Sequence, residues 1–300
     1  MNRRKFVRNF SLGAGAIALS APSFSQSLFL KNSKKITILH TNDTHSNIDP
    51  FPDNHSKFPG MGGIAKRHAL IQQIRQEEEH VLLLDSGDIF QGTPYFNLFN
   101  GVLEMKLMSE LGYDAATMGN HDFDIGLEGF KHAKQYANFP FLCSNYDFSK
   151  TLLKDQTQPF KIFQKGGVKI GVFGIGVELS GLVPSDKYGK TIYLDPILTT
   201  NKIGGELKKK GCDVIICLSH LGYEYADQSK ISDVKLAKQT SNIDLILGGH
   251  THTFLEKATL KKNKIDQQVL INQVGYAGLY LGRIDIDVTT GMMGHSIKVL

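Results

Sequence analysis

Apolar segments of strand length recur along the chain, and they constrain its fold more than any other feature. They alternate with stretches in which apolar residues repeat at helical spacing, a pattern typical of layered α/β domains. The predicted strands are Ile36–Leu39, Val81–Leu84, Phe139–Cys143, Val168–Phe173, Val214–Leu218, Ile243–Leu247, Val269–Val274 and Leu279–Val288. The predicted helices are Ile64–Glu79, Phe96–Leu111, Leu127–Tyr136, Pro196–Lys210 and Ser232–Thr240. The last two strands follow one another without a helix, which predicts a second, partly antiparallel sheet.

Length and charge distribution narrow the class of protein. A chain of 300 residues is long enough to bury the core of one large α/β domain. No apolar run reaches the roughly 18 residues that a membrane-spanning helix needs. The formal net charge is +5, but Arg3, Arg4, Lys5 and Arg8 lie among the first 25 residues with no acid beside them. The remainder is close to neutral, which argues against a nucleic-acid polymer as a partner.

The N-terminal segment predicts a signal peptide over residues 1–26. A basic stretch, Asn2–Asn9, precedes an apolar stretch, Phe10–Ala21, and a tail of small residues. The run Arg3-Arg4-Lys5-Phe6-Val7-Arg8 resembles the twin-arginine export signal, and an ordinary secretory signal that holds two arginines is the alternative. We therefore expect an exported protein, periplasmic if its source is Gram-negative, with a folded domain over residues 34–300.

The three cysteines predict no disulfide framework. Cys212 and Cys217 flank a predicted strand, and five residues of strand span about 16 Å. Because the Cα atoms of a disulfide lie less than about 7 Å apart, these two residues cannot be bridged. Cys143 ends another predicted strand. We expect three small core residues, with no nucleophilic thiol and no sulfur-rich metal site.

Short polar clusters follow the predicted strands or short loops, at the points where the apolar runs end. In open α/β sheets the carboxyl ends of the strands meet at one crevice, so clusters far apart in the sequence can lie together. The clusters are Asp43-Thr44-His45, Asp85-Ser86-Gly87-Asp88, Gly119-Asn120-His121-Asp122, Ser219-His220 and Gly248-Gly249-His250-Thr251-His252. Oxygen and nitrogen donors without thiolates suit zinc, manganese or iron. A single catalytic zinc takes about three protein ligands, so a larger donor set favours two ions.

These motifs, in this order, resemble the signature of the calcineurin-like metallophosphoesterases. The finer resemblance is to the N-terminal catalytic domain of the 5′-nucleotidase branch, and it extends from about Lys35 to the C-terminus. The motifs that carry this finer resemblance are Leu39-His-Thr-Asn-Asp43, Asp85-Ser-Gly-Asp88 and Gly119-Asn-His-Asp-Phe-Asp124. The resemblance implies an α/β fold, a four-layer αββα sandwich with two central mixed sheets.

The resemblance also implies roles for individual residues. One metal ion would be bound by Asp43, His45, Asp88 and His252. The other would be bound by Asp88, Asn120, His220 and His250, so that Asp88 bridges the two together with a water or hydroxide that attacks phosphorus. His121 would be catalytic without binding metal, and Asp124 would orient its ring. We expect Asp85 to support the loop and Asp122 to lie behind the metal ligands or at the surface.

The implied activity is 5′-nucleotidase-like hydrolysis of nucleoside monophosphates by an exported enzyme with two divalent metal ions. Alternatives on the same scaffold are a UDP-sugar or cyclic-nucleotide phosphodiesterase, a thiosulfohydrolase, or a subunit that is active only with a separate substrate-binding chain. Members of the branch typically carry a C-terminal domain that binds the nucleoside, and the resemblance places only the catalytic domain in residues 34–300. We therefore expect a separate C-terminal nucleotidase-domain protein as a possible partner, or broad specificity.

Overall fold

A computed structural model describes residues 35–300 of the chain. The predicted signal peptide, residues 1–26, lies outside the described residues. None of the helices in the described part is both long and apolar enough to cross a membrane.

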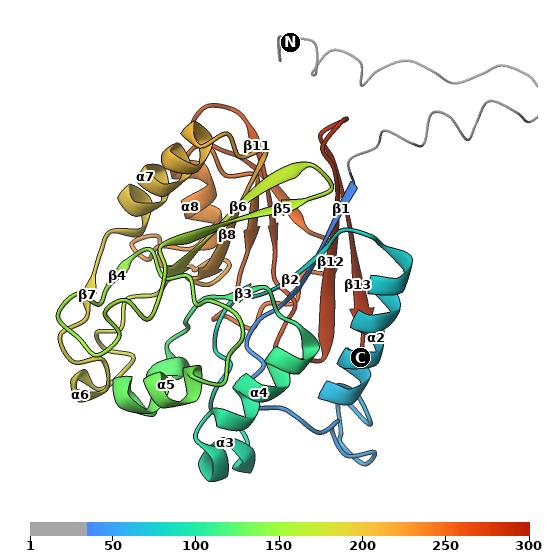
Figure 1. Cartoon of the computed structure of the whole chain (residues 1–300), viewed down its shortest axis with the longest axis vertical. Coiled ribbons are helices and arrows are strands. Elements are labelled where there is room, and N and C mark those ends of the chain that lie inside the picture. The colour runs from blue at the N-terminus through green and yellow to red at the C-terminus, as the bar shows by residue number, and fades with distance from the viewer. Residues whose placement is uncertain (1–34) are drawn as a thin grey trace, which may run out of the picture. The chain divides into compact units, whose positions relative to one another are not determined.

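The first central sheet has the strand order β13-β12-β1-β2-β3. Strands β1 (Lys35–Thr41), β2 (Val81–Asp85) and β3 (Ala115–Ala116) are parallel. Strand β12 (Tyr280–Asp287) pairs antiparallel with β1, and β13 (Met292–Val299) pairs antiparallel with β12. A strand from the C-terminal part of the chain, β12, thus pairs with the first described strand, β1 (Figure 1).

The second central sheet has the order β10-β11-β9-β8-β6-β5. Its four inner strands are parallel, and they are β6 (Val168–Gly176), β8 (Val214–His220), β9 (Leu245–Leu247) and β11 (Gln268–Asn272). The edge strands β5 (Phe160–Lys165) and β10 (Thr259–Lys262) are antiparallel to their neighbours. A separate two-stranded ribbon joins β4 (Tyr146–Asp147) to β7 (Ile192–Tyr193).

Helices cover the outer face of each sheet (Figure 1). The first sheet packs against α2 (Ile64–Glu77), α4 (Val102–Leu111) and α5 (Gly126–Lys134), and the second against α7 (Pro196–Lys209) and α8 (Asp233–Gln239). Shorter helices are α3 (Pro94–Phe99), α6 (Ser185–Tyr188) and the 3₁₀ turn η3 (His121–Phe123). The expected four-layer αββα sandwich with two mixed sheets is confirmed.

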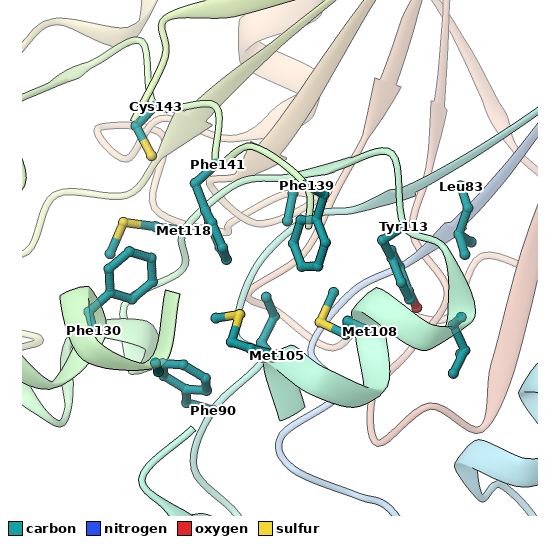
Figure 2. Packing of buried hydrophobic residues seen from close by; sticks show 14 of the residues in the cluster. Leu83, Phe90, Met105, Met108, Tyr113, Met118, Phe130, Phe139, Phe141 and Cys143 are labelled. Carbon is teal, nitrogen blue, oxygen red and sulfur yellow. The ribbon is translucent and has the colours of Figure 1, made fainter. Parts of the chain in front are cut away.

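Period-two alternation in the strands builds the layers. In β8, Val214, Ile216 and Leu218 point into the core between the two sheets, whereas Ile215 and Cys217 point toward α7 and α8. The core under α4 and α5 is rich in aromatic and methionine side chains (Figure 2). Strands buried on both faces explain why they appear in the sequence as continuous apolar runs.

Three details differ from the sequence-based expectations. Residues 139–143 do not form a regular strand: they make only isolated pairings, Phe141 with Ala116 and Leu142 with Gln158. The predicted helix 96–111 is broken at Asn100 and Gly101, which are both left-handed. The two strands expected to share a second sheet, β11 and β12, belong to different sheets.

The expectation that the three cysteines are core residues is confirmed. Cys143, Cys212 and Cys217 are free and buried. Burial raises the pKa of the Cys143 thiol to about 12, so this side chain behaves as a small apolar core residue.

Candidate metal centre

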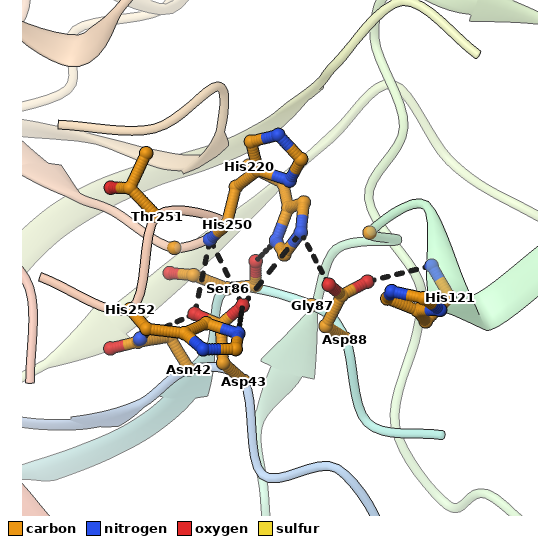
Figure 3. Close-up of polar contacts among 12 residues, drawn as sticks. Asn42, Asp43, Ser86, Gly87, Asp88, His121, His220, His250, Thr251 and His252 are labelled. Carbon is orange, nitrogen blue, oxygen red and sulfur yellow. Dashed lines mark hydrogen bonds and ion pairs between the residues drawn. The ribbon is translucent and has the colours of Figure 1, made fainter. Parts of the chain in front are cut away.

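The two central sheets deliver polar side chains to one place, at the carboxyl ends of their parallel strands. Asp43 and His45 follow β1, and Asp88 follows β2. Asn120 and His121 follow β3, His220 ends β8, and His250 and His252 follow β9. Figure 3 shows how six of these residues face one another, namely Asp43, Asp88, His121, His220, His250 and His252. The structure therefore brings together six of the seven residues predicted as metal ligands, from both sheets, and Asn120 lies in the loop after β3.

The donor atoms form two adjoining groups. Asp43, His45 and His252 offer one, and Asp88, His220 and His250 offer the other, with the donor atoms of each group within 4.8 Å of one another. Asp88 lies near both, because its Oδ2 is 3.0 Å from Nε2 of His220 and 3.9 Å from Nε2 of His45. A carboxylate in this position is suited to bridge two cations.

Hydrogen bonds fix the tautomers of two of the histidines. Nδ1 of His45 lies 3.2 Å from the carbonyl oxygen of Phe90 and 3.1 Å from that of Gln91, and Nδ1 of His220 lies 2.7 Å from that of Ser86. Since a carbonyl oxygen only accepts, each Nδ1 carries the proton and donates. In the neutral ring Nε2 then has the lone pair, the arrangement typical of metal-binding histidines. At His220 burial lowers the pKa, but the nearby Asp88 carboxylate outweighs burial and raises it to about 10, so a cation would displace the Nε2 proton of this ring.

Several donor atoms lack the partners that a cation would supply. Nε2 of His45 and Nε2 of His252 face each other at 3.0 Å. Oδ1 of Asn120 is buried without a hydrogen-bond partner among the described residues. Buried polar groups are normally satisfied, so this convergence fits two divalent cations.

Five of the seven predicted ligands have left-handed backbone conformations. The φ angles are 50° at Asp43, 47° at His45, 55° at Asp88, 75° at His250 and 52° at His252. Such conformations cost about 1–3 kcal/mol each in non-glycine residues and cluster at functional sites. All five residues lie in the loops that follow β1, β2 and β9.

Burial and mutual charge set the protonation of the donor groups. Burial lowers the pKa of His250 and of His252 to about 4 in each case, so both rings are neutral and able to bind metal at pH 7. Burial raises the pKa of Asp43 to about 8. At Asp88 burial acts in the same direction, but the charge of His220 outweighs it and holds the pKa well below the usual range. The buried carboxylates of Asp43 and Asp88 repel each other, and a bound cation would relieve this repulsion.

His121 lies beside the donor groups but is held differently. Its Nδ1 donates to Oδ2 of Asp124 at 2.8 Å, and its backbone N–H donates to Oδ1 of Asp88 at 2.8 Å. The hydrogen bond to Asp124 is the main cause that raises the pKa of His121. Because Nδ1 is engaged, Nε2 is the ring nitrogen available to a substrate.

Two acidic residues of the motifs bond to the protein backbone. Asp85 accepts from Oγ1 of Thr41 at 2.5 Å and from the backbone N–H of Gly87 at 2.9 Å, as expected of a supporting residue. Asp122 is fully buried, so it does not lie at the surface.

The carboxylate of Asp122 organises the loop that carries Asp88. It accepts from the backbone N–H groups of Asp88 at 3.0 Å, Ile89 at 2.9 Å, Phe90 at 3.2 Å and Gly119 at 2.8 Å. These bonds join the loop after β2 to the loop after β3.

Glycine 119 allows those two loops to approach closely. A Cβ atom at this position would come within 2.2 Å of Oδ1 of Asp88 and 2.6 Å of Cε1 of His220. The glycine in the Gly-Asn-His-Asp motif is therefore required by space next to the donor groups.

Two further residues brace the centre, and neither is assigned a role from the sequence. Asn42 donates to Oδ2 of Asp43 at 2.6 Å and accepts from the backbone N–H of Val274. Gln273 donates to the carbonyl oxygen of Gly249 at 2.7 Å and accepts from the N–H of Thr253 at 2.5 Å, on either side of the two histidines of that loop. Gln273 directly follows the parallel strand β11, and a polar residue in that position could have been recognised from the sequence as a candidate site residue.

Comparison with known proteins identifies the family and supports the fold. The family model for calcineurin-like phosphoesterases matches residues 36–254. A 5′-nucleotidase of Vibrio cholerae is 35% identical over 86% of the chain, and a snake venom 5′-nucleotidase of Gloydius brevicauda is 32% identical over 84%. The crystal structure of a 5′-nucleotidase precursor from Thermus thermophilus is 30% identical, with a TM-score of 0.78 over 89% of the chain.

The match covers only part of these relatives. The chain spans 49% of the Vibrio protein, 45% of the snake venom protein and 54% of the Thermus chain.

Proposed function

The chain belongs to the calcineurin-like phosphoesterase family, and from this we propose that it is a metal-dependent phosphoric ester hydrolase acting on nucleoside monophosphates, as a 5′-nucleotidase does. The observation that carries the proposal is the pair of adjoining donor groups with His121 and Asp124 beside them. The similarity to 5′-nucleotidases supports the choice of substrate.

We assign the ligands as the motifs suggest. One cation would be held by Asp43, His45, Asp88 and His252, and the other by Asp88, Asn120, His220 and His250. When bound, two divalent cations supply Lewis-acid stabilisation of phosphoryl oxygens and an activated water. The donor set suits zinc, manganese or iron.

The residues of the chain then position the substrate and move one proton. Asp124 holds the His121 ring through Nδ1, and His121 lines a hollow together with His45 and His252, so Nε2 is the ring nitrogen left for a substrate. From there Nε2 can bond a phosphoryl oxygen or protonate the leaving oxygen as the ester bond breaks. The raised pKa of His121 favours the protonated form that such a donor requires.

Phosphate release by the purified, metal-loaded chain tests this proposal. We expect hydrolysis of 5′-AMP that depends on added manganese or zinc, and a His121→Ala variant that turns over more slowly while it still binds two metal ions. If metal-loaded protein hydrolyses no phosphoester, the enzyme assignment is wrong.

The same assay addresses the expected partner chain. Rates on 5′-AMP and p-nitrophenyl phosphate that are both high in the isolated chain would rule out a required partner. Activity that appears only when a separate C-terminal nucleotidase-domain protein is added would support one.

The leader residues support export by the twin-arginine route. Replacing Arg3 and Arg4 together by lysine should leave the protein in the cytoplasm of a Gram-negative host, whereas the parent chain should reach the periplasm. Export that survives the double replacement would favour the ordinary secretory route.

A further inference from the structure

An aromatic wall adjoins the metal centre on the substrate side. A hollow of about 360 Å³ is lined by His45, His121 and His252 from the centre and by Phe51 and Tyr276 from two loops. Its volume lies in the range of small-molecule sites, about 300–1,000 Å³. The groups that handle phosphate and the aromatic rings therefore share one opening.

The rings form a connected series. Tyr276 stacks on the ring of His252, with centroids 5.0 Å apart and planes 9° from parallel. Phe58 meets Tyr276 edge-on at 6.3 Å and packs against Phe51 at 5.7 Å. Phe51, Phe58 and Tyr276 are each only partly buried, so ring surface remains exposed beside the centre.

Backbone hydrogen bonds hold both loops in place before any ligand binds. On either side of Tyr276, the N–H of Gly275 donates to Thr253 at 3.0 Å and the N–H of Ala277 donates to Asp43 at 2.7 Å. The N–H of Phe51 donates to Met61 at 2.8 Å. A preformed site loses less conformational entropy on binding.

The chemistry of the lining selects the kind of group that fits. No lysine or arginine lines the hollow among the described residues, so it offers no fixed cation for additional phosphates. The exposed part of the aromatic rings instead favours a flat ring, and stacking of a base on an aromatic side chain is worth about 1–3 kcal/mol.

We propose that Phe51 and Tyr276, with Phe58 behind them, form a stacking site for the planar ring of the leaving group. The site lies within the same domain as the metal centre. This inference rests on the proposed function and assigns the base of the nucleoside monophosphate to Phe51 and Tyr276, beside the metal centre.

The preference for 5′-AMP over ribose 5-phosphate tests the contribution of the base, because ribose 5-phosphate carries a hydroxyl group where 5′-AMP carries the base. We expect the ratio of their kcat/KM values to fall about tenfold in Phe51→Ala and in Phe51→Leu. The leucine variant keeps apolar bulk without a flat ring, so it guards against misfolding of the loop. Phe99→Ala, an exposed aromatic position on α3 away from the hollow, is the matched control and should keep the parent ratio. A ratio that is unchanged in both Phe51 variants overturns the stacking site.

Fluorescence provides a readout that needs neither metal nor turnover. The chain has no tryptophan, so Phe51→Trp introduces a single indole at the hollow and Phe99→Trp introduces one elsewhere. We expect adenosine to quench the first and not the second, and ribose to quench neither. Equal quenching in both variants, or none in Phe51→Trp, overturns the stacking site. If adenosine quenches Phe51→Trp but the metal-loaded parent hydrolyses no ester, the stacking site stands and the proposed activity fails.

Discussion

At the residue scale, the metal centre depends on side chains that do not face it. Asp122 is the clearest case, since four backbone N–H groups of the loops after β2 and β3 end on its buried carboxylate. Asp88 is in a left-handed conformation in one of those loops. Hydrogen bonds to Asp122 in the neighbouring loop thus stabilise the strained backbone conformation of Asp88.

Removal of the Asp122 carboxylate should therefore affect both stability and metal content. We expect Asp122→Ala to lower the free energy of unfolding by about 2–4 kcal/mol, because buried N–H donors lose their acceptor. Denaturant unfolding and metal analysis measure the two effects, with the exposed Asp186→Ala as control. An Asp122→Ala protein with parental stability and two bound metals would contradict the role given to this residue.

In the proposed mechanism Asp124 acts through His121, as a positioning residue. Asp124→Asn should lower kcat about 100-fold with little change in KM, since it removes the carboxylate that orients and charges the ring. Adding Asn at position 124 to the His121→Ala variant should cost nothing further. Steady-state kinetics on the two single variants and the double variant test this, and additive losses would show that the two residues act separately.

At the element scale, an ion-pair network ties β1 and β12 to the end of α2. Glu78, just after α2, pairs with Lys35 of β1 at 2.8 Å and with Arg283 of β12. Arg283 also pairs with Asp285 at 2.9 Å. Burial alone would raise the pKa of Glu78 and of Asp285, but their hydrogen bonds to cations lower both.

This network predicts a pH-dependent contribution to stability. Because both folded-state pKa values lie below the unfolded ones, about 4.3 and 3.9, the contribution is present above about pH 5 and is lost as the pH falls through the folded values. Arg283→Gln should lower the free energy of unfolding at pH 7 by less than about 1 kcal/mol, since the groups are partly exposed. Urea unfolding at pH 7 and pH 3 measures this, with Lys264→Gln as control. A difference that grows on acidification would contradict the sign.

The sequence predicted most elements, and its errors have local causes. Helices α2 and α7 begin at the predicted residues, Ile64 and Pro196. The Asn100-Gly101 pair is typical of a turn, but the apolar residues on both sides repeat at helical spacing and so predicted one continuous helix. The apolar run 139–143 pairs briefly with two different neighbours, and apolar composition alone does not reveal that.

Site residues could be predicted where polar side chains directly follow a strand. Residues that support the site through contacts between distant parts of the chain could not be predicted. Polar clusters after β1, β2, β8 and β9 indicated the donor groups. Asn42 bonds to Val274, 232 positions away, and no local pattern in the sequence encodes such a partner.

At the scale of the whole molecule, the proposed ligands join the two sheets. Asp43 and Asp88 follow strands of the first sheet, whereas His220 and His250 come from the second. Bound cations would therefore stabilise the sandwich as well as catalyse.

Metal removal should accordingly lower the melting temperature. At a metal concentration 100 to 1,000 times its Kd, binding adds about 2.7–4.1 kcal/mol. In a protein of this size that corresponds to roughly 5–15 °C. Thermal unfolding by circular dichroism before and after chelation, and after manganese or zinc is restored, measures the shift. An unchanged melting temperature in protein shown to be metal-free would contradict a link between the sheets.

The pairing of β1 with β12 also bears on how the chain is synthesised. Thr37 of β1 and its partner Asp285 of β12 are 248 residues apart. At about 5–20 residues per second, a ribosome needs on the order of 10–50 s to make the second strand after the first. During translation β1 therefore has one unpaired edge although nearly all its side chains belong to the core. A nascent chain stalled before residue 280 keeps this edge open, and open apolar edges pair between molecules.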